Sequence, residues 1–335
     1  MSYVGVIAAG GASRRTGLGT FTSKAALSLR GRSLLSHQLD FLRRSGVDRA
    51  IVICRPAHAR VLGGLLSAEE RALTAFVLSD CATGWAGEVE RAAAHVAPDD
   101  EVLLVSCDNL HEGEALRLGE LDAFFTYTNW TRKVSPTSGP VLARVTTAWG
   151  RPDGERWAQR SGEGFAGDFF SGYAVARREL LFEAIRDVVP SDRGEKEFTA
   201  LLEALLRYPR TAAVPYRYYL RTEALPYPGE YVDVRDLAML ARAHAGLDVW
   251  DESIRVDIGA GVVLRNSDGR VLLLEREDGR GWVPSGGLVD SGETFVHAAV
   301  RETCEEAGVV LDESALRLGE NIAAGYGTVT AVMDG

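Results

Sequence analysis

Paired cysteines, long apolar runs and a surplus of basic residues are all missing from this sequence of 335 residues. No Cys-x-x-Cys motif is formed by its four cysteines, Cys54, Cys81, Cys107 and Cys304. Their spacing argues against a zinc site or a disulfide framework, and reduced thiols are typical of the cytoplasm. No stretch approaches the roughly 18 apolar residues of a membrane span, and the N-terminus lacks the pattern of a signal peptide. We therefore expect a cytoplasmic protein without a membrane partner.

The charge balance restricts the partners further. The formal net charge is −10, from 47 acidic and 37 basic residues. An acidic protein repels a nucleic-acid backbone, which argues against bulk DNA or RNA as a partner. A nucleotide is compatible with this charge, because local basic residues and a metal ion can bind it. The length favours two domains, and 46% hydrophobic residues are enough for two real cores.

Strand and helix patterns alternate through the first half of the chain. Ser33 is a candidate N-cap for a helix that Gly46 closes, with Leu35, Leu39 and Leu42 on one face. Apolar, β-rich runs lie at 3–8, 50–54, 75–78 and 102–107, and further helical patterns lie at 88–96, 177–188, 197–206 and 236–245. This order predicts an α/β fold with a doubly wound, mainly parallel, Rossmann-like sheet. Such sheets bind ligands at the carboxyl ends of their strands.

The pattern changes after Ala245-Gly246. Residues 255–264 and 270–275 flank Asn266-Ser267-Asp268-Gly269, which is a strong turn signal and predicts a hairpin. We therefore expect one domain over residues 1–248 and a second over residues 253–335.

The sharpest motif lies in the second domain. Residues 294–307 contain no Gly or Pro and should be helical, so Glu302, Glu305 and Glu306 lie at i, i+3 and i+4 on one face. A hard divalent cation relieves the repulsion among three carboxylates, and Mg²⁺ also takes phosphate oxygens as ligands. These glutamates are therefore predicted metal ligands, beside a Gly287 that lets the backbone approach a phosphate. The alternative is a solvated, Glu-rich helix face.

The region from Gly287 to Val309 resembles the Nudix box, with Glu293, Arg301-Glu302 and Glu305-Glu306 in register. Thr303 replaces a residue that is more often bulky and aliphatic, and Ser285 departs from the usual Pro-Gly-Gly approach. The resemblance implies an α/β/α sandwich that hydrolyses nucleoside diphosphate-linked substrates, with Glu305 and Glu306 as catalytic residues and Glu293 supporting Arg301. Because 26 residues follow Val309, we expect this sandwich to be partial.

A glycine-rich turn follows the first expected strand. It contains Gly10 and Gly11, and the polar and basic residues Ser13, Arg14, Arg15 and Lys24 come after it. The backbone N–H groups of such a turn face anionic oxygens, and the cations can neutralise a triphosphate. The pattern is neither Gly-x-Gly-x-x-Gly nor a Walker loop.

The turn is similar to the signature of the sugar-phosphate nucleotidyltransferases and of the molybdenum-cofactor guanylyltransferases. In both, a Gly-Gly-x-Ser/Gly-x-Arg loop and a downstream Lys grip a nucleoside triphosphate. The resemblance implies that Gly10, Gly11 and Ser13 bind the nucleotide with Lys24 and with Arg15, the preferred match, or Arg14. The continuation from Lys24 to Leu35 is more similar to the sugar-phosphate enzymes.

Further matches extend the resemblance over about residues 3–245. Asp108, followed by Asn109, resembles the magnesium-binding Asp of a Gly-Asp-Asn site, with Cys107 in place of Gly. Asp233 lies in a segment that resembles the one supplying the second metal ligand. On the substrate side, the resemblance implies Asn109, the turn Phe170-Ser171-Gly172-Tyr173 and the acidic segment that starts at Glu195. The family's Glu-Lys-Pro element is not seen between 140 and 165.

The two resemblances imply a bifunctional Mg²⁺-dependent enzyme. Its first domain would join an NTP to a phosphorylated small molecule, such as a sugar 1-phosphate, and release pyrophosphate. Its second domain would be a Nudix hydrolase. Two alternatives stay open: a hydrolase whose first domain only binds substrate, and a nucleotide-binding sensor with an inactive Nudix segment. The base, the acceptor and the oligomeric state are left open.

Overall fold

Two compact units make up the chain. The first consists of Met1–Gly11, His37–Ala59 and Leu66–Val232, and the second of Ala12–Ser36, Arg60–Leu65 and Asp233–Gly335. The computed structural model describes residues 2–11, 23–79, 83–112, 115, 118, 125–130, 141–145, 154–158, 167–207, 222–226, 230–234, 237–247, 257–290, 293–313, 316–318 and 329–334. No helix within these ranges is both long and apolar enough to cross a bilayer.

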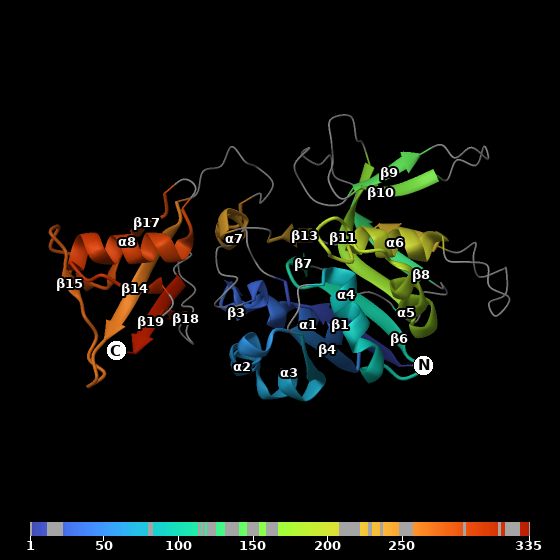
Figure 1. Cartoon of the computed structure of the whole chain (residues 1–335), viewed down its shortest axis with the longest axis horizontal. Helices are drawn as coiled ribbons and strands as arrows, with labels where there is room; N and C mark the ends of the chain where they lie inside the picture. The colour runs from blue at the N-terminus through green and yellow to red at the C-terminus, as the bar shows by residue number, and fades with distance from the viewer. Residues whose placement is uncertain are drawn as a thin grey trace. The chain divides into compact units, whose positions relative to one another are not determined.

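A mixed sheet organises the first unit (Figure 1). Its parallel centre comprises β5 (Thr74–Leu78), β4 (Arg49–Cys54), β1 (Tyr3–Ala8) and β6 (Glu101–Ser106), in that order. β11 (Gly167–Arg177) continues the sheet antiparallel to β6. Beyond it lie β8 (Phe125–Trp130), β9 (Val141–Val145), β10 (Gly154–Ala158) and β12 (Thr222–Pro226). The prediction of a doubly wound, mainly parallel sheet is confirmed for its centre.

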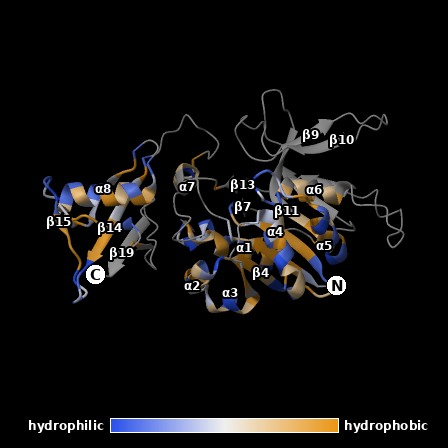
Figure 2. Cartoon of the chain, in the orientation of Figure 1, coloured by the Kyte–Doolittle hydropathy of each residue, from blue (hydrophilic) through white to orange (hydrophobic). Residues whose placement is uncertain are grey.

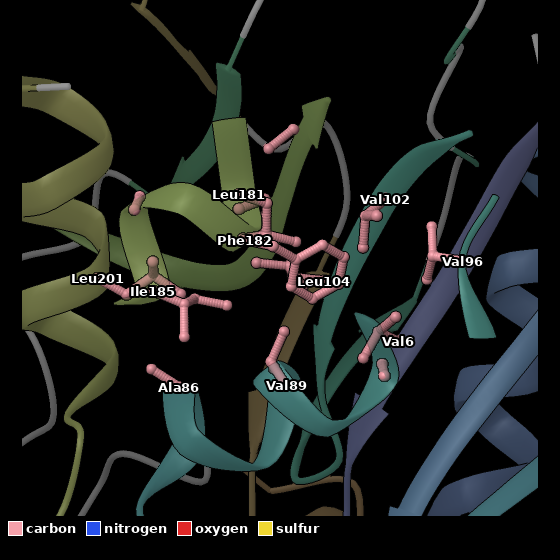
Figure 3. Packing of buried hydrophobic residues seen from close by; sticks show 14 of the residues in the cluster. Val6, Ala86, Val89, Val96, Val102, Leu104, Leu181, Phe182, Ile185 and Leu201 are labelled. Carbon is pink, nitrogen blue, oxygen red and sulfur yellow. The ribbon is translucent and has the colours of Figure 1, made fainter. Parts of the chain in front are cut away.

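The parallel strands in the interior of the sheet are buried on both faces. β1 and β4 are buried along nearly their whole length, as strands covered on two sides must be. Figure 2 shows β4 coloured as hydrophobic. On one face, Val6 and Leu104 pack with Val89 and Ile185 from helices (Figure 3). On the other, Gly5 leaves no room for a side chain, because an added Cβ would lie 2.5 Å from Leu42 Cδ1.

Capping residues set the bounds of α1, and the other helices lie close to their predicted positions or were not predicted. Ser33 caps α1 (Leu34–Arg44) by accepting a hydrogen bond from Ser36 N at 3.0 Å, and Gly46 follows with a φ of 82°, as predicted. The helix predicted at 88–96 starts earlier, as α4 (Trp85–Glu90), and continues as the 3-10 helix η3 (Arg91–His95). The others are α2 (Pro56–Leu65), α3 (Ala68–Leu73), α5 (Arg178–Asp187) and α6 (Phe198–Arg207).

The second unit contains a second sheet, of order β17-β14-β19-β18. Its strands are β14 (Gly259–Arg265), β17 (Ser285–Leu288), β18 (Arg317–Leu318) and β19 (Val329–Asp334). Helix α8 (Phe295–Ala307) lies against β14 and β17. The unit also holds the 3-10 helix η2 (Lys24–Ala26), the hairpin of β2 (Ser28–Leu29) and β3 (Arg32–Ser33), and α7 (Leu237–His244).

The predicted turn after β14 is present, but the strand expected after it is much shorter. Asn266 Oδ1 accepts from Asp268 N and Arg270 N, at 3.1 and 2.8 Å, and Gly269 has a φ of 76°. Past the turn, Val271 makes one bridge to Arg265 and the chain then leaves β14. It forms β15 (Leu274–Glu275), which pairs with β16 (Trp282–Val283). Because residues 274–275 pair with β16, the hairpin with β14 ends after Val271.

Candidate functional sites

The glycine turn follows β1 at the carboxyl edge of the parallel sheet. Ala9 N donates to Ile53 O at 2.8 Å, and Arg55 Nε donates to Gly10 O at 3.1 Å, so β4 and the residue after it hold the turn. A Cβ added to Gly10 would lie 2.5 Å from Glu88 Oε2, whereas one added to Gly11 would meet no atom of the described residues within 4 Å. A side chain at position 10 would therefore force Glu88 to move. The predicted residues Ser13, Arg14 and Arg15 lie outside the described residues.

Asp108 leaves the neighbouring strand at the same edge. Ala8 of β1 pairs with Ser106 of β6, so Gly10 and Asp108 each lie two residues beyond this pair. Ser106 Oγ donates to Asp108 Oδ1 at 2.6 Å, which fixes the carboxylate. Gln38 of α1 donates to Ser106 O and to Asn109 O, which fixes the turn itself. The parallel register thus brings together two motifs that are far apart in the sequence.

Asp233 closes β13 (Glu230–Asp233), which pairs with β7 (Asn109–Glu112), the strand that starts directly after Asp108. The side chain of Asp233 is outside the described residues. Lys24 begins η2, where Ser23 caps the helix, and its Nζ donates to Val234 O at 3.4 Å. Lys24 therefore lies beside the residue that follows Asp233.

Glu195 lies next to the segment that follows β5, another parallel strand of this sheet. It precedes Lys196, whose N donates to Thr83 O at 2.7 Å, and Ala86 N donates to Lys196 O at 3.1 Å. A Cβ on Gly84, which has a φ of 82°, would lie 2.9 Å from Glu195 Cβ. The sequence patterns did not single out the segment 83–86, which follows β5, although a glycine directly before a helix is a signal for it.

Gly172 lies within β11 at a break in strand pairing. Phe170 pairs with Asn129 and Ala174 with Tyr127, so the register of β11 against β8 shifts between them. Such a bulge bends a strand and turns its side chains. On the neighbouring side, Tyr173 pairs with Val105 of β6, three residues before Asp108. The side chains of 171–173 are outside the described residues.

The second candidate site lies on α8. Thr294 caps this helix by accepting from His297 N at 3.1 Å, and Gly308 ends it with a φ of 66° in the left-handed region. The predicted helix over 294–307 is confirmed within one residue. Its carboxylates meet β17, where the Gly286 N–H donates to Glu306 Oε2 at 2.9 Å. A Cβ on Gly287 would lie 2.3 Å from Glu302 Cδ, so Gly287 makes room for that carboxylate.

Arg301 is the centre of the ion pairs on this face. Its Nε and Nη2 donate to the two oxygens of Glu293, at 3.0 and 3.1 Å. Its Nη1 donates to Glu302 Oε1 at 2.8 Å and to Glu305 Oε2 at 3.2 Å, and Nη2 also donates to Leu288 O at 2.9 Å. The bond from Arg301, with one from Asp290 N, lowers the pKa of Glu293. The hydrogen bonds to Glu293 and Glu302 raise the pKa of Arg301, which stays charged.

The three predicted metal ligands of α8 do not converge on one point in this structure. Among the described residues, no group of three His, Cys, Asp or Glu side chains is arranged to hold a metal ion. Glu302 and Glu305 share Arg301, and Glu306 binds the backbone of β17. Protein groups thus relieve the repulsion among the three carboxylates, because the Arg301 guanidinium pairs with Glu302 and Glu305 while the Gly286 N–H binds Glu306.

The two departures from the Nudix pattern are in contact with each other. Ser285 and Thr303 are 3% and 0% exposed, and their hydroxyl oxygens lie 2.9 Å apart. Thr303 Oγ1 donates to Ala299 O at 2.7 Å, which leaves it to accept from Ser285. Ser285 has a second acceptor, Val262 O, only at 3.5 Å. A buried hydrogen bond thus joins α8 to β17 one residue before Gly286.

Two family models match separate parts of the chain. Residues 5–117 match a family model described as a MobA-like NTP transferase domain, and residues 256–327 match the NUDIX domain. A comparison with curated proteins gave no match.

Two solved structures resemble the chain over about three quarters of its length. One is a Bacillus anthracis protein assigned as a glucose-1-phosphate thymidylyltransferase, in complex with sucrose. Its TM-score is 0.59 at 17% identity, over 76% of this chain and 98% of the other. The second is a UDP-glucose pyrophosphorylase complexed with UDP-glucose, with a TM-score of 0.57 at 12% identity, over 73% of this chain and 98% of the other. At these identities the likeness establishes a shared fold.

Proposed function

We propose that this chain, which carries a MobA-like NTP transferase domain followed by a NUDIX domain, both forms and hydrolyses phosphoanhydride-linked nucleotides. We assign the transfer reaction to residues 1–248 and the hydrolysis to residues 253–335. The observation that carries the first assignment is the pairing of Ala8 with Ser106. In this register the glycine turn and Asp108 follow neighbouring strands at one edge of a parallel sheet, and because such sheets bind ligands at this edge, the register supports the assignment.

The transfer reaction needs positioning and neutralisation of charge more than covalent work by the protein. The N–H groups of Gly10 and Gly11 would face the phosphates, while Lys24 and Arg15, or Arg14, would neutralise the triphosphate. An oxygen of the acceptor phosphate then attacks the α-phosphate in line, and pyrophosphate leaves. Asp108 and Asp233 are the proposed ligands of Mg²⁺, which would supply charge stabilisation at the phosphates.

The proposed acceptor class rests on the two similar solved structures and on residues near the carboxyl edge of the sheet. Both structural neighbours carry sugar names, which supports a sugar 1-phosphate as the acceptor. Asn109 follows the proposed metal ligand, Gly172 lies at the bulge of β11, and Glu195 packs against the turn after β5. We propose these three residues for contacts to the acceptor.

The transfer activity is tested by pyrophosphate release. The full chain is incubated with each of four NTPs and a panel of sugar 1-phosphates in the presence of Mg²⁺. We expect one pairing to release pyrophosphate, Asp108→Asn to abolish the release, and Asp99→Asn, at an exposed position, to leave it unchanged. If no pairing releases pyrophosphate, the transfer proposal is wrong.

For the NUDIX domain, we propose Glu302, Glu305 and Glu306 as Mg²⁺ ligands. Their oxygens are the donor type that Mg²⁺ prefers, and two of them adjoin Gly286 and Gly287 of β17. The metal would supply Lewis-acid polarisation and water activation when bound. Glu305 and Glu306 are the proposed catalytic residues, and Arg301 would hold Glu302 and Glu305 close to each other until the cation replaces its contacts. The substrate would be a nucleoside diphosphate linked to another moiety.

The two activities can be separated by substitution. Glu306→Gln is expected to abolish hydrolysis of nucleoside diphosphate-linked compounds and to leave pyrophosphate release unchanged. Glu277→Gln, an exposed change in the β15–β16 turn, is the matched control. Hydrolysis that survives in Glu306→Gln would contradict the proposal. Hydrolysis without transfer would favour a hydrolase alone, and binding without either reaction would favour a nucleotide sensor.

A further inference from the structure

A buried carboxylic acid lies directly beneath the glycine turn. Glu88 belongs to α4, and 3% of its surface is exposed. Its Oε2 lies 2.5 Å from the position that a Cβ of Gly10 would take, so the acid touches the main chain of the turn. No part of the proposed transfer mechanism uses this group.

The hydrogen bonds of Glu88 are incomplete. Oε1 accepts from Ser79 Oγ at 3.2 Å, and the backbone N–H of Thr83 also donates to the carboxylate. Within the part of the chain that the structure describes, Oε2 has no hydrogen-bond partner. A buried carboxylate oxygen without a donor is costly when ionised, and protonation removes that charge. Oε2 is therefore the atom at which a proton is most favourable.

The charges that face Glu88 do not cancel the effect of burial. Burial raises its pKa, and the opposing contributions of Ser79, Arg91, Thr83 and Arg55 are each smaller. The Arg55 guanidinium is also engaged by Gly10 O. Cys54 adds no negative charge, because burial and the nearby Glu88 raise its pKa to about 11 and the thiol stays neutral.

A negative charge at this position opposes the proposed ligand of the turn. Gly10 and Gly11 are proposed to present N–H groups to a polyphosphate, and Glu88 lies behind the first of them. In a buried environment, like charges repel more strongly than they do in water. An ionised Glu88 would thus weaken polyphosphate binding, and a neutral Glu88 would not.

We propose that Glu88 is a positioning residue that couples NTP binding to proton uptake, with Oε2 taking one proton from solvent when a polyphosphate occupies the Gly10–Gly11 turn. The inference rests on the proposed function of this turn. It predicts that NTP affinity falls as pH rises past the ionisation of Glu88, by up to about tenfold per pH unit for one linked proton.

The test is titration calorimetry of the full chain with each NTP and Mg²⁺, from about pH 5 to about pH 8, in buffers of different ionisation enthalpy. The nucleotide's terminal phosphate also titrates in this range, so Glu88→Gln gives the baseline for the same ligand. We expect wild type to take up more protons than Glu88→Gln, whose affinity should fall less with pH. Glu69→Gln, an exposed change in α3, should behave like wild type.

A second variant retains Glu88 and changes the pH at which it ionises. Ser79→Ala removes the donor that favours the charged form of Glu88. The pH at which affinity falls should therefore move upward, a shift that a merely structural change would not produce. Equal proton uptake in wild type and Glu88→Gln, or an unmoved profile in Ser79→Ala, would overturn the inference alone. Failure of every NTP to bind would overturn it together with the proposed function.

Discussion

The Ser285–Thr303 pair gives a quantitative prediction for the stability of the NUDIX domain. Thr303→Val removes a hydroxyl that is fully buried and replaces it with a methyl group of similar size. Among the described residues, Ser285 is then left with Val262 O as its acceptor, at a distance of 3.5 Å that is at the limit of a hydrogen bond. A buried hydroxyl without a good partner costs about 1–3 kcal/mol.

The reciprocal change should cost less. In Ser285→Ala, Thr303 keeps its bond to Ala299 O at 2.7 Å, so the loss is that of one ordinary hydrogen bond, about 0.5–1.5 kcal/mol. Replacing both partners with apolar groups leaves no unsatisfied hydroxyl and can be nearly neutral. We therefore expect the double variant to be less destabilised than the sum of the single variants, by about 1 kcal/mol or more.

Hydrogen exchange of the α8 amides, measured by mass spectrometry on the full chain, is the assay. Since 1.4 kcal/mol corresponds to a factor of ten, Thr303→Val should speed exchange by roughly five- to a hundredfold. The double variant should exchange more slowly than additivity requires. Additive effects, or unchanged exchange in Thr303→Val, would refute the reasoning that the two departures from the Nudix pattern support each other.

Three further changes have definite expected outcomes. Gly287→Ala places a Cβ 2.3 Å from Glu302 Cδ, so hydrolysis should fall while pyrophosphate release is retained in the same preparation. Gly308→Ala puts a side chain at a φ of 66°, which should lower the stability of α8 by about 1 kcal/mol in hydrogen exchange; a neutral effect would contradict the left-handed cap. The lowered pKa of Glu293 means that its bond to Arg301 stabilises the fold above the ordinary Glu pKa of 4.5 and is lost as pH falls below it. Protection of α8 should therefore drop on acidification in wild type, and a drop of equal size in Glu293→Gln would exclude this ion pair as the cause.

Local signals predicted much of the fold. Ser33 and Gly46 bracket α1, and the gap in Gly and Pro over 294–307 matches α8, because caps and periodicity depend on nearby residues. The central strands were found because burial on both faces makes them continuous apolar runs. The shortened strand after Asn266–Gly269 was not predicted, since residues 270–275 can pair with either β14 or β16 and the apolar pattern does not choose between these two neighbours.

At the candidate sites, too, local patterns could not predict contacts between residues that are far apart in the chain. Motif spacing singled out Gly10, Asp108 and the α8 glutamates as candidates, whereas no local pattern could reveal that Glu88 is buried against Gly10. Ser285 and Thr303 were visible only as two unrelated departures, because they are 18 residues apart in the chain. Convergence of the carboxylates was expected from helical spacing alone, and spacing does not include the competing partners, Arg301 and the Gly286 N–H.

The most direct test of the account is phosphorus NMR of the full chain with an NTP, a sugar 1-phosphate and Mg²⁺, repeated with a chelator. The account predicts that the signals of both reactants decrease while pyrophosphate and a nucleoside diphosphate-linked product appear, and that the chelator stops this change. Spectra that stay unchanged for every NTP and acceptor, with Mg²⁺ present, would contradict the central claim that this edge of the sheet transfers nucleotides.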